Sequence, residues 1–199
     1  TILNDIERNP HGILFWRSLT QWIGGLGIIG FTIVLLPGFG TSSQMLYLSE
    51  VTGVTHDKIY PKTRVMARYI LIVYLSLTLI ESALLWIGGM GFFDAVCHSL
   101  STTATGGFST RQDSIAYYHS PYIEYVVSAF MLLSAINFSL YIAMLKGKKK
   151  QLWKNAELRW FFSSVAILTL IITISLTFAK GYGPEEAFRK ALFQVATCH

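Results

Sequence analysis

Four long apolar stretches, separated by polar segments, dominate the pattern of this 199-residue chain. A helix needs about 20 predominantly apolar residues to cross about 30 Å of hydrocarbon, and each stretch is that long. The pattern therefore predicts four membrane-spanning helices. Their apolar parts cover residues 13–36, 69–93, 125–145 and 160–179.

A fifth uncharged stretch, residues 95–110, is shorter than the others and rich in hydroxyl groups. Asp94 precedes it, and aspartate is a favoured N-cap, so we expect a short helix from just after Phe93 to about Thr102. The pair Gly106-Gly107 disfavours continuation of that helix. Non-helical backbone at membrane depth is tolerated only where protein buries it or where it lines a watery cavity. The stretch thus predicts a half-helix that dips into the membrane and returns.

The distribution of basic residues distinguishes this dip from a full crossing. If the stretch returns to the same side, one face of the membrane holds ten basic residues and the other five; if it crosses, the split is eight to seven. The positive-inside rule favours the first arrangement, with the Gly106-Gly107 turn toward the outside. The ten are Lys58, Lys62, Arg64, Arg68, Lys146, Lys148, Lys149, Lys150, Lys154 and Arg159, and the five are Arg8, Arg111, Lys180, Arg189 and Lys190.

The same order of elements begins again near the end of the chain. Pro184-Glu185-Glu186 has the features of a helix start, with proline in the first turn and acids at its positive end. The following residues 188–199 are too short to cross and are typical of a second dip. Internal duplication is common in pore and transporter folds. We therefore predict an all-α membrane protein built from membrane–pore–membrane repeats with re-entrant pore half-helices.

Composition and charge narrow the function classes. The chain is 52% hydrophobic and 14% charged, whereas soluble domains carry about 25% charged residues. This excludes a disordered, fibrous or disulfide-rich secreted protein. The net charge of +5 comes largely from loops that flank the predicted spans, which indicates membrane topology. We expect a lipid bilayer as its surroundings and no nucleic acid as a partner.

The residues that follow the half-helix suit a cation filter. Glycine permits backbone conformations that aim successive carbonyl groups at one axis, and such carbonyls can replace the hydration shell of an ion. The half-helix would point the negative end of its dipole at that ion. On the pattern alone, an ordinary loop of serine, threonine and glycine between two spans remains the alternative.

Three motifs carry a resemblance to a known family. The stretch Phe92–Arg111, which contains Ser-Thr-Thr-Ala-Thr-Gly-Gly-Phe-Ser, resembles the second pore loop of Trk-type potassium transporter membrane subunits, in the Trk/Ktr/HKT superfamily. Phe15–Gly27 resembles the helix after that family's first pore loop, and Phe188–Gln194 the start of its third. The motifs occur in the family's order and cover essentially the whole chain.

The resemblance implies four membrane–pore–membrane repeats around one pore, of which this chain holds parts of three. Residues 1–40 would end repeat one, 66–145 would form repeat two, and 160–199 would begin repeat three. Residues 41–65 and the basic segment 146–159 would be cytoplasmic loops.

The resemblance also implies potassium uptake through a selectivity filter, with K⁺ as the transported ion and no cofactor, metal or catalytic residue in this chain. It further implies a multi-pass protein of the inner (plasma) membrane, a homodimer, and a cytoplasmic nucleotide-binding regulatory subunit. The filter residues would be Thr103, Ala104, Thr105, Gly106 and Gly107, with Asp94 and Thr102 supporting the pore helix.

Two other functions remain open from the residues themselves. Asp94 and His98 form an i, i+4 pair on one helix face, and with Ser101 they suggest an intramembrane enzyme, although no catalytic motif such as Gly-x-Ser-x-Gly accompanies them. A structural membrane subunit is the other alternative.

The pairs Cys97-His98 and Cys198-His199 contain residue types that bind zinc, but their adjacent placement is unlike the spacing of zinc sites.

Polar and small residues inside the predicted spans raise two further questions. Arg17 and Glu81 are charged residues within apolar stretches, where they either pair inside the bundle or reach water. The glycines at positions 24, 25, 27 and 30 favour close packing of the first span against a neighbouring helix.

Overall fold

The computed structural model describes residues 6–35, 63–136, 140, 141, 144 and 155–198. Regular structure within them is helical and contains no strand, so the prediction of an all-α fold is confirmed there. Most of the predicted loop 41–65 and the basic run Lys146–Lys150 lie outside the described residues. The helices are α1 (His11–Leu35), α3 (Thr63–Ile87), α4 (Phe92–Thr103), the 3₁₀-helix η2 (Ser114–Tyr118), α5 (Pro121–Ala135), α8 (Ala156–Lys180) and α9 (Pro184–Cys198).

The long helices have the length that a membrane span needs. Helices α1, α3 and α8 contain 25 residues each, which corresponds to about 37 Å at 1.5 Å per residue. Among the described residues, Arg68–Ile87 and Ala156–Phe178 are long and apolar enough to cross a bilayer. Local signals fix the ends of α8: the side chain of Asn155 accepts a hydrogen bond from the Glu157 amide, and Gly181 ends the helix in the left-handed conformation.

Helix α5 differs from the predicted span over residues 125–145. It begins at Pro121, where proline fits the first turn of a helix, and it ends at Ala135 because Ile136 is extended. The Leu133 carbonyl oxygen accepts both the Ile136 amide at 3.2 Å and the Tyr141 hydroxyl at 2.7 Å, so a carbonyl in the last turn is bound from beyond the helix. The third apolar stretch is therefore not one continuous helix.

The second predicted span, residues 69–93, also ends earlier than expected. Helix α3 stops at Ile87, the chain reverses through Gly88 and Gly89, and α4 begins at Phe92. Gly89 has a φ of +93°, which glycine adopts without steric cost. Hydropathy missed this break because the segment between the helices carries no charge. The 12 residues of α4 extend about 18 Å, too short to cross the hydrocarbon.

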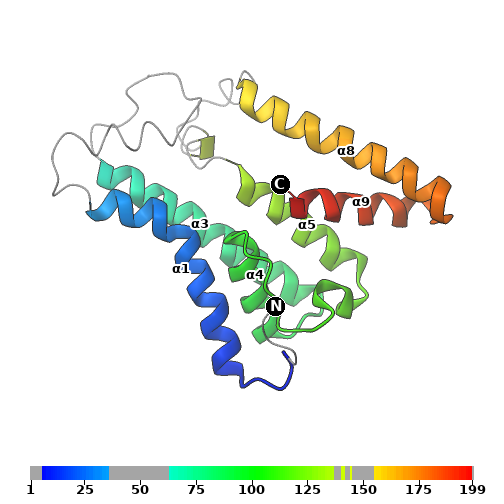
Figure 1. Cartoon of the computed structure of the whole chain (residues 1–199). Coiled ribbons are helices and arrows are strands. Elements are labelled where there is room, and N and C mark those ends of the chain that lie inside the picture. Colours follow the sequence, from blue (N-terminus) through cyan, green and yellow to red (C-terminus); the bar gives the residue numbers. More distant parts are fainter. Residues whose placement is uncertain (1–5, 36–62, 137–139, 142–143, 145–154, 199) are drawn as a thin grey trace.

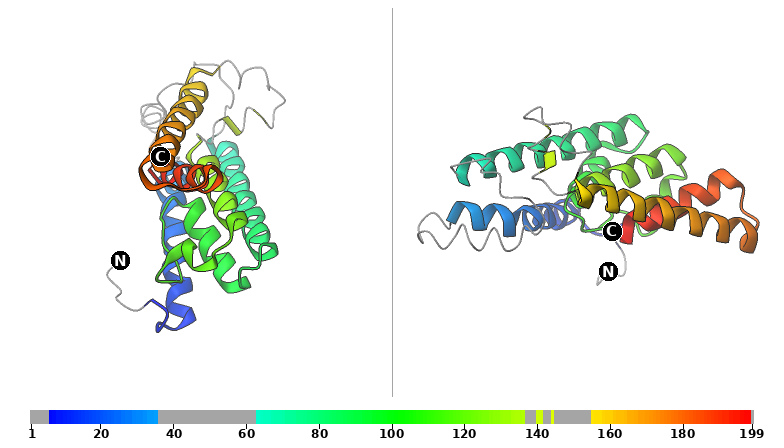
Figure 2. Two further views of the ribbon diagram at one scale, coloured as in Figure 1. Left: turned by 90° about the vertical axis from the view of Figure 1, so that its right-hand side faces the viewer. Right: turned by 90° about the horizontal axis from the view of Figure 1, so that it is seen from above.

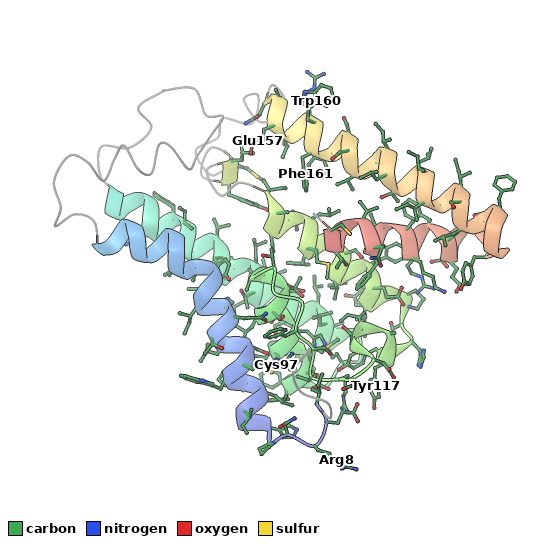
Figure 3. The ribbon with its side chains drawn as sticks, in the orientation of Figure 1. Arg8, Cys97, Tyr117, Glu157, Trp160 and Phe161 are labelled. Atoms are coloured by element: carbon green, nitrogen blue, oxygen red, sulfur yellow. The ribbon has the colours of Figure 1, made fainter. Side chains whose placement is uncertain are left out.

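Helix α4 occupies the middle of the fold. It packs against α1, α3 and α5, while α9 packs against both α5 and α8 (Figure 1). In two further views α8 lies at the edge of the molecule (Figure 2). Trp160 on α8 points away from the other helices (Figure 3) and is 76% exposed. The principal buried apolar cluster, under α4, consists of Leu85, Met90, Ala95, Ile115, Ile123 and Val127.

The segments before α1 and after α4 lie at the same end of the bundle. The guanidinium of Arg111 is 3.9 Å from the carboxylate of Glu7. A full crossing by residues 95–110 would put these two residues on opposite faces of a membrane. Their proximity therefore fits a re-entrant path for α4 and the turn that follows it.

Candidate pore-loop site

The chain leaves α4 at Thr103 and turns sharply through residues 104–107. Thr105 and Gly107 have φ values of +53° and +69°, so two of the four turn residues lie in the left-handed region. The amide nitrogens of Thr105 and Gly106 donate back to the carbonyls of Thr102 and Ser101 at 2.9 and 2.8 Å. These bonds close the C-terminal end of α4, where the helix dipole is negative.

The carbonyl groups of this turn fall into two sets. The Ala104 oxygen accepts a hydrogen bond from the Thr105 hydroxyl at 2.8 Å, and the Gly106 oxygen accepts one from Gln21 at 3.0 Å. The carbonyl oxygens of Thr103, Thr105 and Gly107 accept no hydrogen bond from the described residues. Three unpaired carbonyls thus gather at the negative end of a short helix, which is an arrangement that can bind a cation.

Gln21 of α1 holds the turn from a neighbouring helix. Its amide nitrogen donates to the Gly106 carbonyl, and its amide oxygen accepts a hydrogen bond from the Ser101 hydroxyl at 2.9 Å. The same Ser101 oxygen accepts the backbone N–H of Phe108 at 2.6 Å. A Cβ atom at position 106 would overlap the Gln21 side chain. A larger residue at position 106 would therefore displace the Gln21 amide from the Gly106 carbonyl.

One face of α4 holds the chain that returns from the turn. Ser101, His98 and Asp94 follow one another along this face and bind successive residues of the returning segment. Ser101 binds the amide of Phe108, His98 Nε2 lies 3.0 Å from the Ser109 hydroxyl, and Asp94 accepts the Thr110 hydroxyl at 2.7 Å. The returning segment therefore runs antiparallel to α4 and is fastened to it at three levels.

Asp94 does not cap α4, contrary to the prediction. Gly91 is the N-cap and Asp94 lies in the first helical turn, from which its carboxylate also accepts hydrogen bonds from Arg111 at 3.2 Å and Tyr118 at 2.9 Å. The local N-cap signal was outweighed by these partners from the loop. Burial alone raises the pKa of Asp94, but the hydrogen bonds and the charge of Arg111 outweigh burial and place that pKa below its ordinary value.

Behind the turn, α3 supplies a buried polar cluster. The Thr103 side chain points away from the turn toward Glu81 and Thr78, whose nearest oxygens lie 3.5 and 3.3 Å from its hydroxyl. Glu81 is completely buried, and its Oε1 atom has no hydrogen-bond partner among the described residues. Thr78 also accepts the indole N–H of Trp22 at 3.0 Å. Glu81 therefore faces the interior, where it supports the end of α4.

Arg17 and Gly25 of α1 also contact this region. The Arg17 guanidinium stacks over the Phe108 ring at 3.9 Å, so this intramembrane charge pairs with an aromatic face. A Cβ at position 25 would lie 2.7 Å from the Tyr74 hydroxyl and 3.1 Å from the Ala104 Cα. Close packing through the glycines of α1 is thus found at Gly25, whereas a Cβ at Gly24 or Gly27 would meet nothing within 4 Å.

The groups suggested for an enzyme have structural partners. His98 is buried, with Nδ1 2.8 Å from the Asp94 carbonyl and Nε2 against Ser109. Asp94 and Ser101 fasten the returning segment in the same way.

Cys97 lies buried at the centre of the helices (Figure 3) and Cys198 is exposed, and both are free thiols. Across the described residues, no group of three or more His, Cys, Asp or Glu side chains is arranged to hold a metal.

Comparison with known proteins identifies the family. Residues 1–182 match the TrkH family, whose description is "Cation transport protein". The chain belongs to the TrkH family. It is accordingly a helical membrane protein from a family of transporters and not of enzymes, as the motifs Phe15–Gly27 and Phe92–Arg111 indicated.

Curated TrkH-family relatives cover the chain almost completely. The Trk system potassium uptake protein TrkH of Vibrio parahaemolyticus is 37% identical over 202 residues, which are 99% of this chain and 42% of the relative. The Trk system potassium uptake protein TrkG of Escherichia coli K12 is 38% identical over 175 residues, or 87% and 36% of the two chains. The chain thus spans about two fifths of the length of the TrkH relatives.

A solved structure has the same fold. The crystal structure of the potassium transporter TrkH from Vibrio parahaemolyticus superposes with a TM-score of 0.80 at 34% identity, over 99% of this chain and 40% of that one. This TrkH-family chain therefore represents a contiguous portion of that helical membrane architecture.

Sequence reasoning missed the contribution of α1 and α3 to the site. Gln21 and Trp22 occur within the motif that resembles the family, but no role was assigned to them. An amide inside a long uncharged stretch was the available signal, because a buried polar group needs a partner. The identity of the partner, Gly106, depends on tertiary structure.

Proposed function

We propose that this chain forms part of the ion-conducting pore of a potassium uptake protein, in which residues Thr103–Gly107 line one side of a selectivity filter. The observation that carries this proposal is that the carbonyl oxygens of Thr103, Thr105 and Gly107, at the C-terminal end of α4, accept no hydrogen bond from the residues that the structure describes. Carbonyl dipoles of this kind replace the hydration shell of a cation. The curated relatives support potassium as the ion, because they are named as potassium uptake proteins.

The residues around the turn have a supporting role in this proposal. Asp94 fastens the returning segment to the start of α4, and Thr102 and Thr103 connect its end to the buried Glu81. Only backbone oxygens then face the ion, and the side chains hold the backbone in place. Because this chain represents about two fifths of its relatives, the remaining segments of the longer protein would complete the pore.

The test is the flux of rubidium and sodium through the full-length parent protein in proteoliposomes, with wild type compared with Gly106→Ser. A side chain at position 106 collides with the Gln21 amide, so the amide or the turn must move, the Gly106 carbonyl loses this hydrogen bond, and the preference for rubidium over sodium should fall. Gly24→Ser is the matched control, since a Cβ there meets nothing within 4 Å. Unchanged selectivity in Gly106→Ser would mean that residues 103–107 form an ordinary loop and not a selectivity filter.

We also propose that the parent protein resides in the inner membrane and works as a homodimer with a cytoplasmic nucleotide-binding regulatory subunit. The naming of the relatives as Trk system proteins supports action together with other components, and the resemblance of the sequence motifs implies the membrane, the dimer and the regulatory subunit. The basic loops 56–68 and 146–159 are the surfaces where we expect the regulatory contact. Crosslinking from Arg159, compared with crosslinking from Arg111 at the opposite end, tests this: capture of the regulatory subunit only from Arg111 would contradict the proposal.

A further inference from the structure

We infer that Gln21 is a positioning residue for ion selection, which sets the direction of the turn's carbonyl groups from a different part of the chain. Gln21 lies on α1, 85 residues before Gly106, yet both ends of its amide bind the turn. Its nitrogen donates to the Gly106 carbonyl and its oxygen accepts from Ser101. This inference rests on the proposed function, because it concerns the same group of carbonyls.

The contact restrains the turn at its least regular point. Gly106 lies between Thr105 and Gly107, both of which have positive φ values. The peptide group is planar, so a hydrogen bond that fixes the Gly106 carbonyl also fixes the plane of the peptide between Gly106 and Gly107. The carbonyls of Thr105 and Gly107 on either side accept no hydrogen bond from the described part of the chain. Their directions therefore depend on a bond made to their neighbour.

Ser101 connects this restraint to both arms of the pore loop. Its hydroxyl donates to Gln21 and accepts the Phe108 amide, and its carbonyl accepts the Gly106 amide at 2.8 Å. The Gln21 amide thus belongs to a small network that includes the end of α4, the turn and the start of the returning segment. Loss of one member of such a network affects the geometry of the others.

Packing on the next turn of α1 reinforces the same contact. Gly25 is four residues after Gln21 and brings the α1 backbone against Ala104 and Tyr74. Tyr74 in turn donates to the Trp22 carbonyl at 3.0 Å. The position of α1, and hence the reach of Gln21, is fixed by this close approach. The amide can therefore act as a rigid support for Gly106.

The experiment measures rubidium and sodium flux through the full-length parent in proteoliposomes at matched protein content. Gln21→Met keeps the shape of the side chain and removes both hydrogen bonds. We expect its rubidium-to-sodium ratio to fall about fivefold to tenfold, the change that corresponds to one or two ordinary hydrogen bonds. Thr20→Val is the matched control, because the exposed Thr20 hydroxyl donates to the Arg17 carbonyl of its own helix and to no other group among the described residues.

Two further variants keep the result decisive. Gln21→Glu retains an acceptor for Ser101 but has no donor for Gly106, so it should lower the ratio even if Gln21→Met does not fold. Gly106→Ser, measured alongside, tests the pore assignment itself. A lower ratio in Gly106→Ser with an unchanged ratio in both Gln21 variants would overturn the inference and leave the proposed function in place. Unchanged ratios in all three would overturn both. A fall in both fluxes at constant ratio would assign Gln21 a merely structural role.

Discussion

The Thr110 hydroxyl donates to the carboxylate of Asp94 at 2.7 Å, across 16 positions of sequence. The bond joins the start of α4 to the segment that leaves the turn, so the two ends of the re-entrant loop are tied together. Arg111 and Tyr118 bind the other carboxylate oxygen. Asp94 thus receives three hydrogen bonds from the returning chain, more than Ser101 or His98 makes with that segment.

Replacement of Asp94 by asparagine should loosen this closure. The amide removes the charge that Arg111 neutralises and cannot accept from all three donors. Hydrogen bonds to charged groups contribute about 1.5–3 kcal/mol each, so we expect the free energy of unfolding to fall by about 2 kcal/mol. Thermal unfolding of the detergent-solubilised full-length parent measures this. Asp113→Asn, an exposed position in the same loop, is the control and should leave the unfolding temperature unchanged.

The contribution of Asp94 to stability should depend on pH in a defined direction. Its pKa in the folded protein lies below the ordinary value of 3.8, because hydrogen bonds and Arg111 outweigh the effect of burial. A carboxyl with a lowered pKa stabilises the fold above its ordinary pKa, and this stabilisation is lost as the pH falls through the folded value. The difference in unfolding temperature between wild type and Asp94→Asn should be constant from pH 7 to about pH 5 and shrink below pH 4. A difference that grows on acidification would contradict this assignment.

Local signals in the sequence were sufficient to predict the elements of the re-entrant loop. A short hydroxyl-rich stretch followed by Gly106-Gly107 predicted a half-helix and a non-helical turn, and the structure has α4 over Phe92–Thr103 followed by that turn. Pro184 with two following acids predicted the start of α9, which begins there. Such signals act within one or two turns of backbone and therefore appear in a single sequence.

The parts that could not be predicted depend on contacts between distant residues. Asp94 has the features of an N-cap, but loop partners up to 24 residues later bind its carboxylate instead. The end of α5 at Ala135 falls within a continuous apolar stretch, where hydropathy gives no boundary. The amide of Gln21 was visible as a polar group in a span, but its partner was not. These features require the arrangement of α1, α3 and α4 in space.

Glu81 should be replaceable by glutamine but not by alanine. Its Oε2 atom lies near the Thr103 hydroxyl, and among the described residues no basic side chain pairs with it. Glutamine keeps an acceptor of the same shape, so we expect stability within about 1 kcal/mol of wild type. Alanine leaves a cavity and removes the acceptor to which the Thr103 hydroxyl donates, at a cost of about 2–4 kcal/mol. Unfolding temperatures compare the two variants, and equal values would show that the contact with Thr103 contributes nothing.

The adjacent glycines of α1 should respond oppositely to alanine. At Gly25 the new methyl group would press on the Tyr74 hydroxyl and on the backbone of Ala104. Backbone cannot move aside cheaply, so we expect Gly25→Ala to cost about 1–3 kcal/mol. At Gly24 nothing lies within 4 Å, and alanine should gain up to about 1 kcal/mol from its higher helix propensity. Thermal unfolding of both variants distinguishes close packing at one position from a general requirement for small residues in α1.

The junction between α5 and α9 should depend on one partly buried ion pair. The Arg189 guanidinium lies 2.6 Å from the Glu124 carboxylate, and the two side chains are only 13% and 19% exposed. Removal of Arg189 takes away the cation that pairs with Glu124, whereas removal of Glu124 leaves Arg189 with Glu185, 3.3 Å away on its own helix, as a second partner. A double-mutant cycle with Arg189→Met and Glu124→Gln should therefore give a coupling energy of about 1–3 kcal/mol.

The neighbouring pair of Lys190 and Glu186 is the control. It lies within one helix, and each side chain is about 40% exposed, so the cycle Lys190→Met and Glu186→Gln should give a much smaller coupling energy. Similar coupling in both cycles would mean that the contact between α5 and α9 is held by apolar packing, and that Arg189 contributes no more than a surface charge.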